Sequence, residues 1–345
     1  MRHREARAVT LHDVAREAGV AVSTVSRALS NPGRVSPRTR DRIRAVAQRL
    51  DYQPNRIAQA LPSGRTQMLA LLVPDITNPH HFGLVRGAEA QARAAGYTLV
   101  IGDTQESPEL ESVHAQRLGS VVDGIVLAAS RLAEADLHAL ASRRPVVLFN
   151  REVDGFPGVV TDSADGARQI VQHLVALGHR SIAYLAGPPD LWTDGVRWRA
   201  LSTHAERAGV GIARLGPFSP TVDHGAAAAD VGLASGATAL VAFNDLLAIG
   251  VLRRLERLGI AVPGRVSVVG FDDVFGSDFC HPPLTTVTSP VDQAGRTLID
   301  LLLGARADRQ VVLPTPLRVR DSTGPAAPAA ATGGSGGPRT PSPRS

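Results

Sequence analysis

Three short helices are predicted near the start of the chain, where apolar residues recur at intervals of three and four positions. The first follows Thr10, which together with Asp13 resembles a capping box. The second covers residues 23–29. The third spans 36–51 and begins with a Ser-Pro pair, in which Ser is the N-cap and Pro the first helical residue. Two short helices joined by a glycine-containing turn and backed by a third are typical of a helix-turn-helix, here over 10–29. A three-helix bundle without a role in DNA binding has the same spacing.

From Met68 onward the pattern changes to apolar runs of strand length that alternate with helical stretches. Strands are predicted at 68–73, 98–101, 124–128, 145–149, 181–186, 239–243 and 267–270, and helices at 84–95, 112–118, 166–177 and 246–258. This alternation predicts parallel sheets with helices on both faces. The fold class is therefore an all-α helix-turn-helix head plus an α/β body of two doubly wound parallel-sheet lobes. No Gly-x-Gly-x-x-Gly follows a strand, so nothing favours a dinucleotide-binding fold.

These patterns divide the chain into four parts. We expect a helix-turn-helix domain at 1–54, a hinge helix and linker at 55–66, a two-lobed effector-binding and dimerisation domain at 67–322, and a disordered tail at 323–345. The hinge helix is about half the length at which an isolated helix becomes even marginally stable, so it should form only when docked. The tail is rich in Gly, Pro, Ala and Ser and cannot bury enough apolar surface to order itself.

Charge is distributed unevenly along the chain, although the net charge is only +5. Residues 1–66 hold 13 Arg against 5 acidic residues, whereas residues 67–322 hold 22 Arg against 27. A basic head on a mildly acidic body indicates that the head meets a polyanion. Cys280 is the single cysteine, and the start of the chain is too polar for a signal peptide, so we expect a cytoplasmic protein.

Several segments of the head resemble the LacI/GalR family of bacterial repressors, namely 9–15, 19–20, 24–27 and 50–58. The resemblance implies that Val22 and Ser23 are the variable base readers and that Arg27 is the more uniform one. It implies phosphate contacts near six further residues, which are Thr10, Thr24, Ser26, Arg34, Ser36 and Thr39. The family usually has a Ser cap where this chain has Ala21, a loss that costs about 1 kcal/mol unless Ser23 or the backbone compensates.

The resemblance extends into the hinge, where Asn55, Ala58 and Leu61 belong to the implied DNA-binding set. In the family this segment folds on operator DNA, and paired leucines wedge into a minor-groove step. Leu61 would be that wedge, and Ala58 would let the two hinges of a dimer approach. Pro62 departs from the pattern because it pushes Leu61 away from helical geometry.

The body resembles the same family and its periplasmic sugar-binding relatives, in segments that include 74–79, 173–179, 268–273 and 282–287. Head and body together carry the similarity over residues 9 to about 323. In the family the effector sits between the lobes at the carboxyl ends of the strands, as expected for open α/β sheets. The implied effector-binding residues are His80, His81, Asp162, Thr193, Arg197, Phe218, Asn244 and Asp272.

The chemistry of this set suits a polar ligand, although each residue has a simpler interpretation. Asp162 and Asp272 follow strand ends and could cap helices or turns, and Arg197 could be surface charge. The family commonly has two aromatic residues where this chain has His80 and His81. Imidazoles keep flat faces but add hydrogen bonds and a proton switch near neutral pH, so we expect a more polar effector. No metal-ligand spacing accompanies the pair.

The leading hypothesis is a sequence-specific DNA-binding transcriptional regulator, a repressor, whose operator affinity is controlled by a small polar effector, foremost a sugar. Its partners would be double-stranded operator DNA with an inverted repeat, the effector, and a second copy of the chain in a homodimer, with no membrane, no cofactor and no metal. A transport-type sugar-binding protein should have a signal peptide and no helix-turn-helix. An enzyme of sugar processing should have a nucleophile or an acid/base pair, and none emerges from the spacing.

Overall fold

The computed structural model describes residues 9–30, 32–52 and 65–327. The chain divides into two compact units, Met1–Gln67 and Met68–Ser345, which we call the head and the body. The predicted hinge residues Asn55, Ala58 and Leu61 lie outside the described residues.

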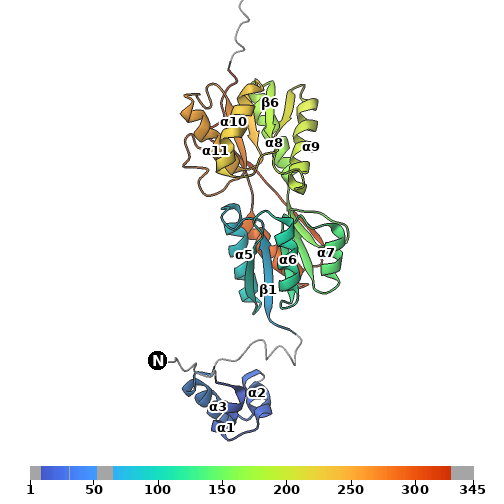
Figure 1. The fold of residues 1–345 in the computed structure, drawn as a ribbon, viewed down its shortest axis with the longest axis vertical. Coiled ribbons are helices and arrows are strands. Elements are labelled where there is room, and N and C mark those ends of the chain that lie inside the picture. The colour runs from blue at the N-terminus through green and yellow to red at the C-terminus, as the bar shows by residue number, and fades with distance from the viewer. Residues whose placement is uncertain (1–8, 31, 53–64, 328–345) are drawn as a thin grey trace, which may run out of the picture. The chain divides into compact units, whose positions relative to one another are not determined.

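Within the described residues 9–30 and 32–52, the head contains three α-helices and a 3-10 turn (Figure 1). These are α1 (Leu11–Ala18), α2 (Val22–Ser30), η1 (Pro32–Arg34) and α3 (Pro37–Arg49). The capping box is present, because the Thr10 hydroxyl accepts from the Asp13 N–H at 3.3 Å and the Asp13 carboxylate accepts from the Thr10 N–H at 2.9 Å. Gly19 then ends α1 with a φ of +62°, a conformation that glycine adopts without strain. The predicted helix order is confirmed, although the third helix ends earlier than expected.

Over its described residues 68–327, the body contains two six-stranded sheets that define two lobes (Figure 1). The N-terminal lobe contains β1 (Met68–Val73), α5 (His80–Ala94), β2 (Thr98–Asp103), α6 (Pro108–Gly119), β3 (Gly124–Ala128), α7 (Glu134–Ala141), β4 (Val146–Phe149), β5 (Gly158–Thr161), α12 (Val291–Leu302) and β11 (Gln310–Leu313). Its strand order is β11-β5-β4-β3-β1-β2, and every pairing is parallel.

The C-terminal lobe has the same architecture. It contains α8 (Ser163–Ala176), β6 (Ser181–Leu185), α9 (Trp192–Arg207), β7 (Gly211–Leu215), η2 (Val222–His224), α10 (Gly225–Ala234), β8 (Ala239–Ala242), α11 (Asp245–Arg257), β9 (Ser267–Asp272), β10 (Thr285–Thr288) and β12 (Leu317–Arg318). The strand order is β12-β10-β9-β8-β6-β7, and only the pairing of β12 with β10 is antiparallel among the described strands.

Each sheet is buried on both faces, which explains the continuous apolar runs of its strands. In β1, Leu69 and Leu71 pack in one cluster with residues of α5 and α12, whereas Ala70 and Leu72 pack on the other face in a cluster that includes residues of α6 and α7. The C-terminal lobe repeats this alternation along β6, whose successive residues contribute to two separate clusters. The predicted fold class, two doubly wound parallel-sheet lobes behind a helix-turn-helix head, is thus confirmed.

The chain passes between the lobes at three places among the described residues, 161–163, 288–291 and 313–317 (Figure 1). Two of these crossovers touch, because the Thr315 hydroxyl donates to the Asp162 carbonyl at 2.6 Å. Crossovers at the edge of both sheets leave the carboxyl ends of the strands of the two lobes facing one another, where a ligand can bind.

The boundary predicted for the tail lies a few residues too early. The Thr323 hydroxyl is 2.9 Å from His173 Nε2, and the Ala326 N–H donates to the Leu177 carbonyl at 2.8 Å. The chain is therefore packed against the C-terminal lobe through residue 326. Within the described ranges, no helix combines the length and the apolar character needed to cross a bilayer.

Candidate nucleic-acid interface and effector pocket

The outer face of α2 carries the side chains that the sequence assigns to base reading. Ser23 and Arg27 are exposed, whereas Val25, on the inner face, is completely buried against the other helices of the head. Arg27 Nε lies 3.3 Å from the Ser23 carbonyl and donates to it. The remaining predicted DNA-binding residues of the described head are exposed or half-buried; these are Thr10, Val22, Thr24, Ser26, Arg34, Ser36 and Thr39. The geometry therefore leaves this set accessible to a partner.

One predicted cap of the head is absent, and the cap that the sequence already lacks at Ala21 is not replaced by a side chain of that residue. Ser36 stands at the N-cap of α3, but its hydroxyl donates to Thr39 Oγ1 at 2.9 Å and does not cap the helix. At the start of α2, the Ala21 carbonyl accepts from the N–H groups of Thr24 and Val25 at 2.9 and 3.2 Å. The Ala21 methyl group offers no acceptor to the helix N-terminus, so the side-chain cap is absent at this position.

A cavity of about 60 Å³ lies between the lobes of the body, and both lobes line it. The lining residues are Pro74, Asn78, His80, His81, Glu106, Ala129, Phe149, Asn150, Leu191, Thr193, Arg197, Pro220, Phe243, Asn244 and Asp272. Many of them follow the carboxyl ends of strands directly, as Phe243 and Asn244 follow β8. Six of the eight predicted effector residues are among them, and Asp162 and Phe218 are not.

The two histidines begin α5 and are buried in the cavity wall. Burial lowers the pKa of His80, and burial together with the neighbouring His80 lowers the pKa of His81 to about 3. Both rings are therefore neutral near pH 7, and the proton switch expected from the sequence is not supported. His80 stacks on Phe149 with ring centroids 6.3 Å apart. The Nδ1 atoms of both histidines are buried and have no hydrogen-bond partner in the described part of the chain.

Arg197 and Asp272 form a buried ion pair, so Arg197 is not surface charge. Arg197 Nη2 donates to Asp272 Oδ1 at 3.1 Å, and Nη1 donates to the Phe243 carbonyl. The guanidinium carbon lies 4.2 Å from the ring centroid of Phe271 and 5.0 Å from that of Phe243. Across the cleft, His80 Nδ1 lies 3.7 Å from the same Asp272 oxygen. Asp272 therefore joins groups from both lobes.

Asn244 lines the cavity, but its amide is already engaged in local structure. Its oxygen caps α11 by accepting from the Leu247 N–H at 3.0 Å, and its nitrogen donates to the Pro220 carbonyl at 3.0 Å. An amide oxygen has a second lone pair and an NH₂ group has a second hydrogen, so each atom keeps one further bond for a ligand.

Two predicted effector residues do not line the cavity. Asp162 lies at the first crossover, where its carboxylate caps α8 by accepting from the Asp165 N–H at 2.9 Å. The capping interpretation left open by the sequence is therefore the one that its contacts support. Phe218 is half-buried against the cluster of the C-terminal lobe, and its N–H donates to the Ala186 carbonyl at 2.9 Å. Neither side chain reaches the ligand position inferred from the sequence.

Several lining residues were not predicted, and three of them share a backbone signature with the predicted Asp272. Glu106, Ala129, Asn150 and Asp272 have positive φ values of 58°, 47°, 53° and 111° without being glycine. Such strained backbone tends to gather at ligand sites. The sequence offered one usable indication, because Asn150 directly follows the buried strand of residues 146–149. No comparable indication marked Glu106.

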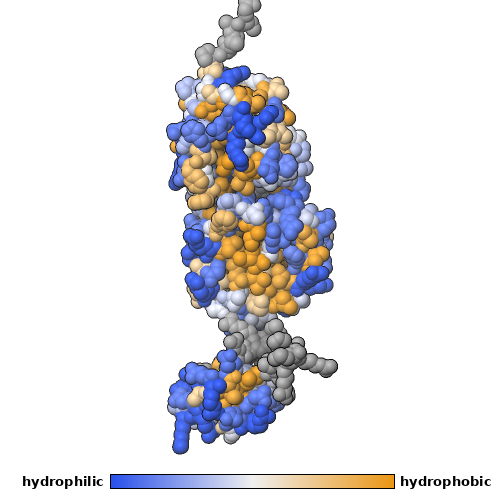
Figure 2. All heavy atoms as spheres, turned by 60° about the vertical axis from the view of Figure 1, so that its left-hand side comes forward, coloured by the Kyte–Doolittle hydropathy of each residue, from blue (hydrophilic) through white to orange (hydrophobic). Residues whose placement is uncertain are grey.

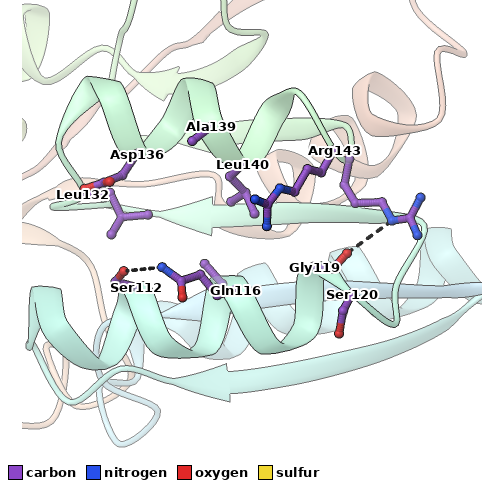
Figure 3. A pocket seen from close by; sticks show the side chains of 11 residues that line it. Ser112, Gln116, Gly119, Ser120, Leu132, Asp136, Ala139, Leu140 and Arg143 are labelled. Atoms are coloured by element: carbon purple, nitrogen blue, oxygen red, sulfur yellow. Dashed lines mark hydrogen bonds between the residues drawn. The ribbon is translucent and has the colours of Figure 1, made fainter.

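A larger hollow of about 440 Å³ lies between α6 and α7, on the outside of the N-terminal lobe (Figure 3). Its floor includes Leu132 and Leu140, and Gln116 and Arg143 lie along its sides (Figure 3). None of the predicted effector residues lines it. Among the described residues, buried polar atoms without hydrogen-bond partners line the smaller cavity between the lobes and not this groove.

Comparisons with known proteins agree with both parts of the chain. A family model described as bacterial regulatory proteins of the lacI family matches residues 10–55, and one described as a periplasmic binding protein-like domain matches residues 171–323. The HTH-type transcriptional regulator DegA of Bacillus subtilis is 34% identical, over 92% of this chain and 98% of DegA. The HTH-type transcriptional repressor CytR of Escherichia coli is 32% identical, over 86% of this chain and 89% of CytR.

Solved structures show the same similarity. The Lac repressor dimer bound to operator and the anti-inducer ONPF has a TM-score of 0.83 at 28% identity, over 92% of this chain and all of that one. A LacI family regulator from Enterococcus faecium with bound ribose has a TM-score of 0.66 at 27% identity, over 75% of this chain and 99% of that one.

Proposed function

Because the chain belongs to the LacI family of bacterial transcription regulators, we propose that it is a repressor whose operator affinity is set by a small sugar bound between the lobes. The observation that carries the proposal is the interlobe cavity, where the buried Nδ1 atoms of His80 and His81 have no hydrogen-bond partner among the described residues. The same chain exposes Ser23 and Arg27 on the outer face of α2. A ligand there can shift operator affinity only by binding the closed and open arrangements of the lobes with different affinities.

The charges around the cavity favour an uncharged ligand. Glu106 is paired with Arg131, Asp272 is paired with Arg197, and both histidines are neutral. A sugar phosphate or an amino acid would bring a charge for which the lining has no unpaired counterpart. A neutral sugar instead supplies hydroxyl groups that can donate to a carboxylate oxygen and accept from an amide. We therefore infer a neutral sugar as the effector.

The second partner is another copy of the chain, in a homodimer on an inverted repeat. Support comes from apolar side chains that both lobes expose. Strand β2 is an edge strand with Ile101 exposed, and its neighbourhood adds Val113 of α6 (Figure 2 shows hydrophobic surface on the N-terminal lobe). In the C-terminal lobe, Phe275 and Phe279 are 79% and 67% exposed, with ring centroids 5.1 Å apart. Exposed edges and aromatic pairs of this kind are normally covered by a partner.

The test is operator binding by the full-length protein, with DNA from upstream of its own gene and a panel of neutral sugars. We expect a footprint with two-fold symmetry that one sugar alters and that weakens steeply with added salt, because phosphate contacts release counterions. Arg27→Ala should lower specific affinity by at least tenfold through loss of a base contact, whereas Arg93→Ala, an exposed change on α5 of the body, should not. Salt-insensitive binding, or equal behaviour of the two variants, would contradict the proposal.

A further inference from the structure

One side chain of the N-terminal lobe reaches across the cleft to the other lobe. Arg131 follows β3, and its Nε lies 3.5 Å from the carboxylate of Asp190, in the loop between β6 and α9. The Arg131 side chain is only 11% exposed, whereas that of Asp190 is 49% exposed. The contact therefore joins a shielded guanidinium on one lobe to an accessible carboxylate on the other.

The N-terminal lobe holds Arg131 firmly from several sides. Its Nη1 donates to the Glu106 carbonyl at 2.7 Å, its Nη2 donates to the Glu106 carboxylate, and its backbone N–H donates to Glu111 at 2.8 Å. Glu106 is itself fixed, because its N–H donates to the Pro74 carbonyl at 2.7 Å and its φ is positive. With the guanidinium fixed on its own lobe, the distance to Asp190 depends on how far the lobes have closed.

Both ends of this contact are coupled to the cavity. Glu106 lines the cavity from one lobe, and Leu191, the residue after Asp190, lines it from the other. The loop of Asp190 also leads into α9, which carries Thr193 and Arg197 into the cavity wall. Any ligand that holds the lobes further apart must therefore lengthen the Arg131–Asp190 distance.

The cavity that remains with the contact in place is small. Its volume of about 60 Å³ has room for roughly four to six water molecules. One sugar ring, with about ten heavy atoms, displaces water on the order of this amount. A second ring would not fit unless the lobes separated.

We propose that the contact between Arg131 and Asp190 selects the effector by size, so that a monosaccharide is bound with the contact closed and a disaccharide only with it broken. This inference rests on the proposed function, namely a neutral sugar in the interlobe cavity. Asp190 then determines specificity without contacting the sugar. Its ion pair with Arg131 stabilises only those complexes in which the lobes are close enough for the pair to form.

The test measures the affinity of the full-length protein for two groups of sugars by calorimetry. The monosaccharides are D-ribose, D-xylose, D-glucose and D-galactose, and the disaccharides are cellobiose, maltose and lactose. We expect the tightest monosaccharide to bind the unchanged protein at least tenfold more tightly than any disaccharide. Asp190→Asn should weaken the binding of that monosaccharide three- to tenfold and leave the disaccharide affinities unchanged. The preference for the monosaccharide over disaccharides should therefore become smaller.

Asp230→Asn is the matched control, because Asp230 is also 49% exposed but pairs with Arg254 in its own lobe. It should leave all affinities unchanged. A disaccharide that binds the unchanged protein as tightly as the best monosaccharide would overturn the size rule while leaving a sugar-controlled repressor intact. Equal effects of Asp190→Asn on both groups would overturn the role of Asp190. Binding of no sugar at all would overturn both this inference and the proposed effector class.

Discussion

Single residues around the cavity illustrate how burial changes chemistry that the sequence alone suggests. A histidine pair in water would titrate near neutral pH, but His81 is buried beside His80, and both effects disfavour a second positive charge. The same enclosure leaves its Nδ1 atom without a hydrogen-bond partner among the residues that the structure describes. The two neutral rings can therefore form hydrogen bonds with a ligand, but they do not change charge near neutral pH.

The depressed pKa of His81 predicts a dependence of stability on pH. In the unfolded chain this group takes up a proton below about pH 6.5, whereas in the folded chain it does so only near pH 3. The folded state is therefore favoured at neutral pH and loses stability as the pH falls from 6.5 towards 3. Between pH 6.5 and pH 5 the loss from this one group should be about 2 kcal/mol. Urea unfolding of the body at the two pH values measures it.

A variant isolates this contribution from the other titrating groups. His81→Phe keeps a flat ring and removes the titration, so its stability should fall about 2 kcal/mol less over the same interval. Replacing the exposed His224 by Gln controls for the loss of one imidazole elsewhere in the body. An identical pH dependence of His81→Phe and the unchanged protein would show that His81 is not buried in its neutral form.

At the scale of elements, the sequence predicted several strands and helices and missed others, among them α9 and α10, whose composition hides a helical period. The strands β1, β3 and β8 were predicted because each is a short continuous apolar run, which is typical of a strand buried on both faces. Helix α10 reads GAAAADVGLA and has no polar face to give a helical period. Helix α9 was missed for the opposite reason, because Asp194 and Arg197 are polar residues on its buried face.

A position directly after a strand does not by itself identify a residue of the site. Asn150 and Asp162 each follow a strand of the N-terminal sheet, so both are polar residues at a carboxyl end. The chain after β4 stays at the cleft, and Asn150 lines the cavity. The chain after β5 crosses to the other lobe, and Asp162 becomes the cap of α8. Strand spacing does not reveal such a crossover, and neither does it reveal the reach of Arg131 to Asp190.

The capping box of α1 provides a prediction at this scale. Thr10→Ala removes a hydroxyl that accepts the Asp13 N–H, so the first turn of α1 should lose about 1 kcal/mol. Amide hydrogen exchange of residues 11–18 in the full-length protein should then be about fivefold faster. Ser36→Ala is a matched control, because Ser36 occupies the N-cap of α3 without making the capping bond. If Ser36→Ala accelerates exchange in α3 as much as Thr10→Ala does in α1, the capping hydrogen bonds of α1 add no stability beyond that of any hydroxyl at an N-cap.

At the scale of the whole molecule, the proposed function requires two copies, because an inverted repeat offers one half-site to each head. The exposed Phe275 and Phe279 are then the side chains whose burial in a dimer contributes most. Replacing Phe279 by Arg places a charge in that contact and removes an aromatic anchor. Removing such an anchor typically costs roughly 2–4 kcal/mol of binding free energy. The dimer dissociation constant should therefore rise at least tenfold, and by about a hundredfold for a loss near the middle of that range.

Sedimentation equilibrium of the full-length protein measures the dissociation directly, and operator binding should weaken in parallel, since one head alone holds half the contacts. Val312→Arg is the control: Val312 is 56% exposed on β11, at the edge of the N-terminal sheet opposite β2. It introduces the same charge on an exposed apolar residue away from the proposed contact and should leave the dimer intact. If Val312→Arg separates the copies and Phe279→Arg does not, the dimer contact involves the β11 edge, and coupling between cleft and operator must pass through that edge.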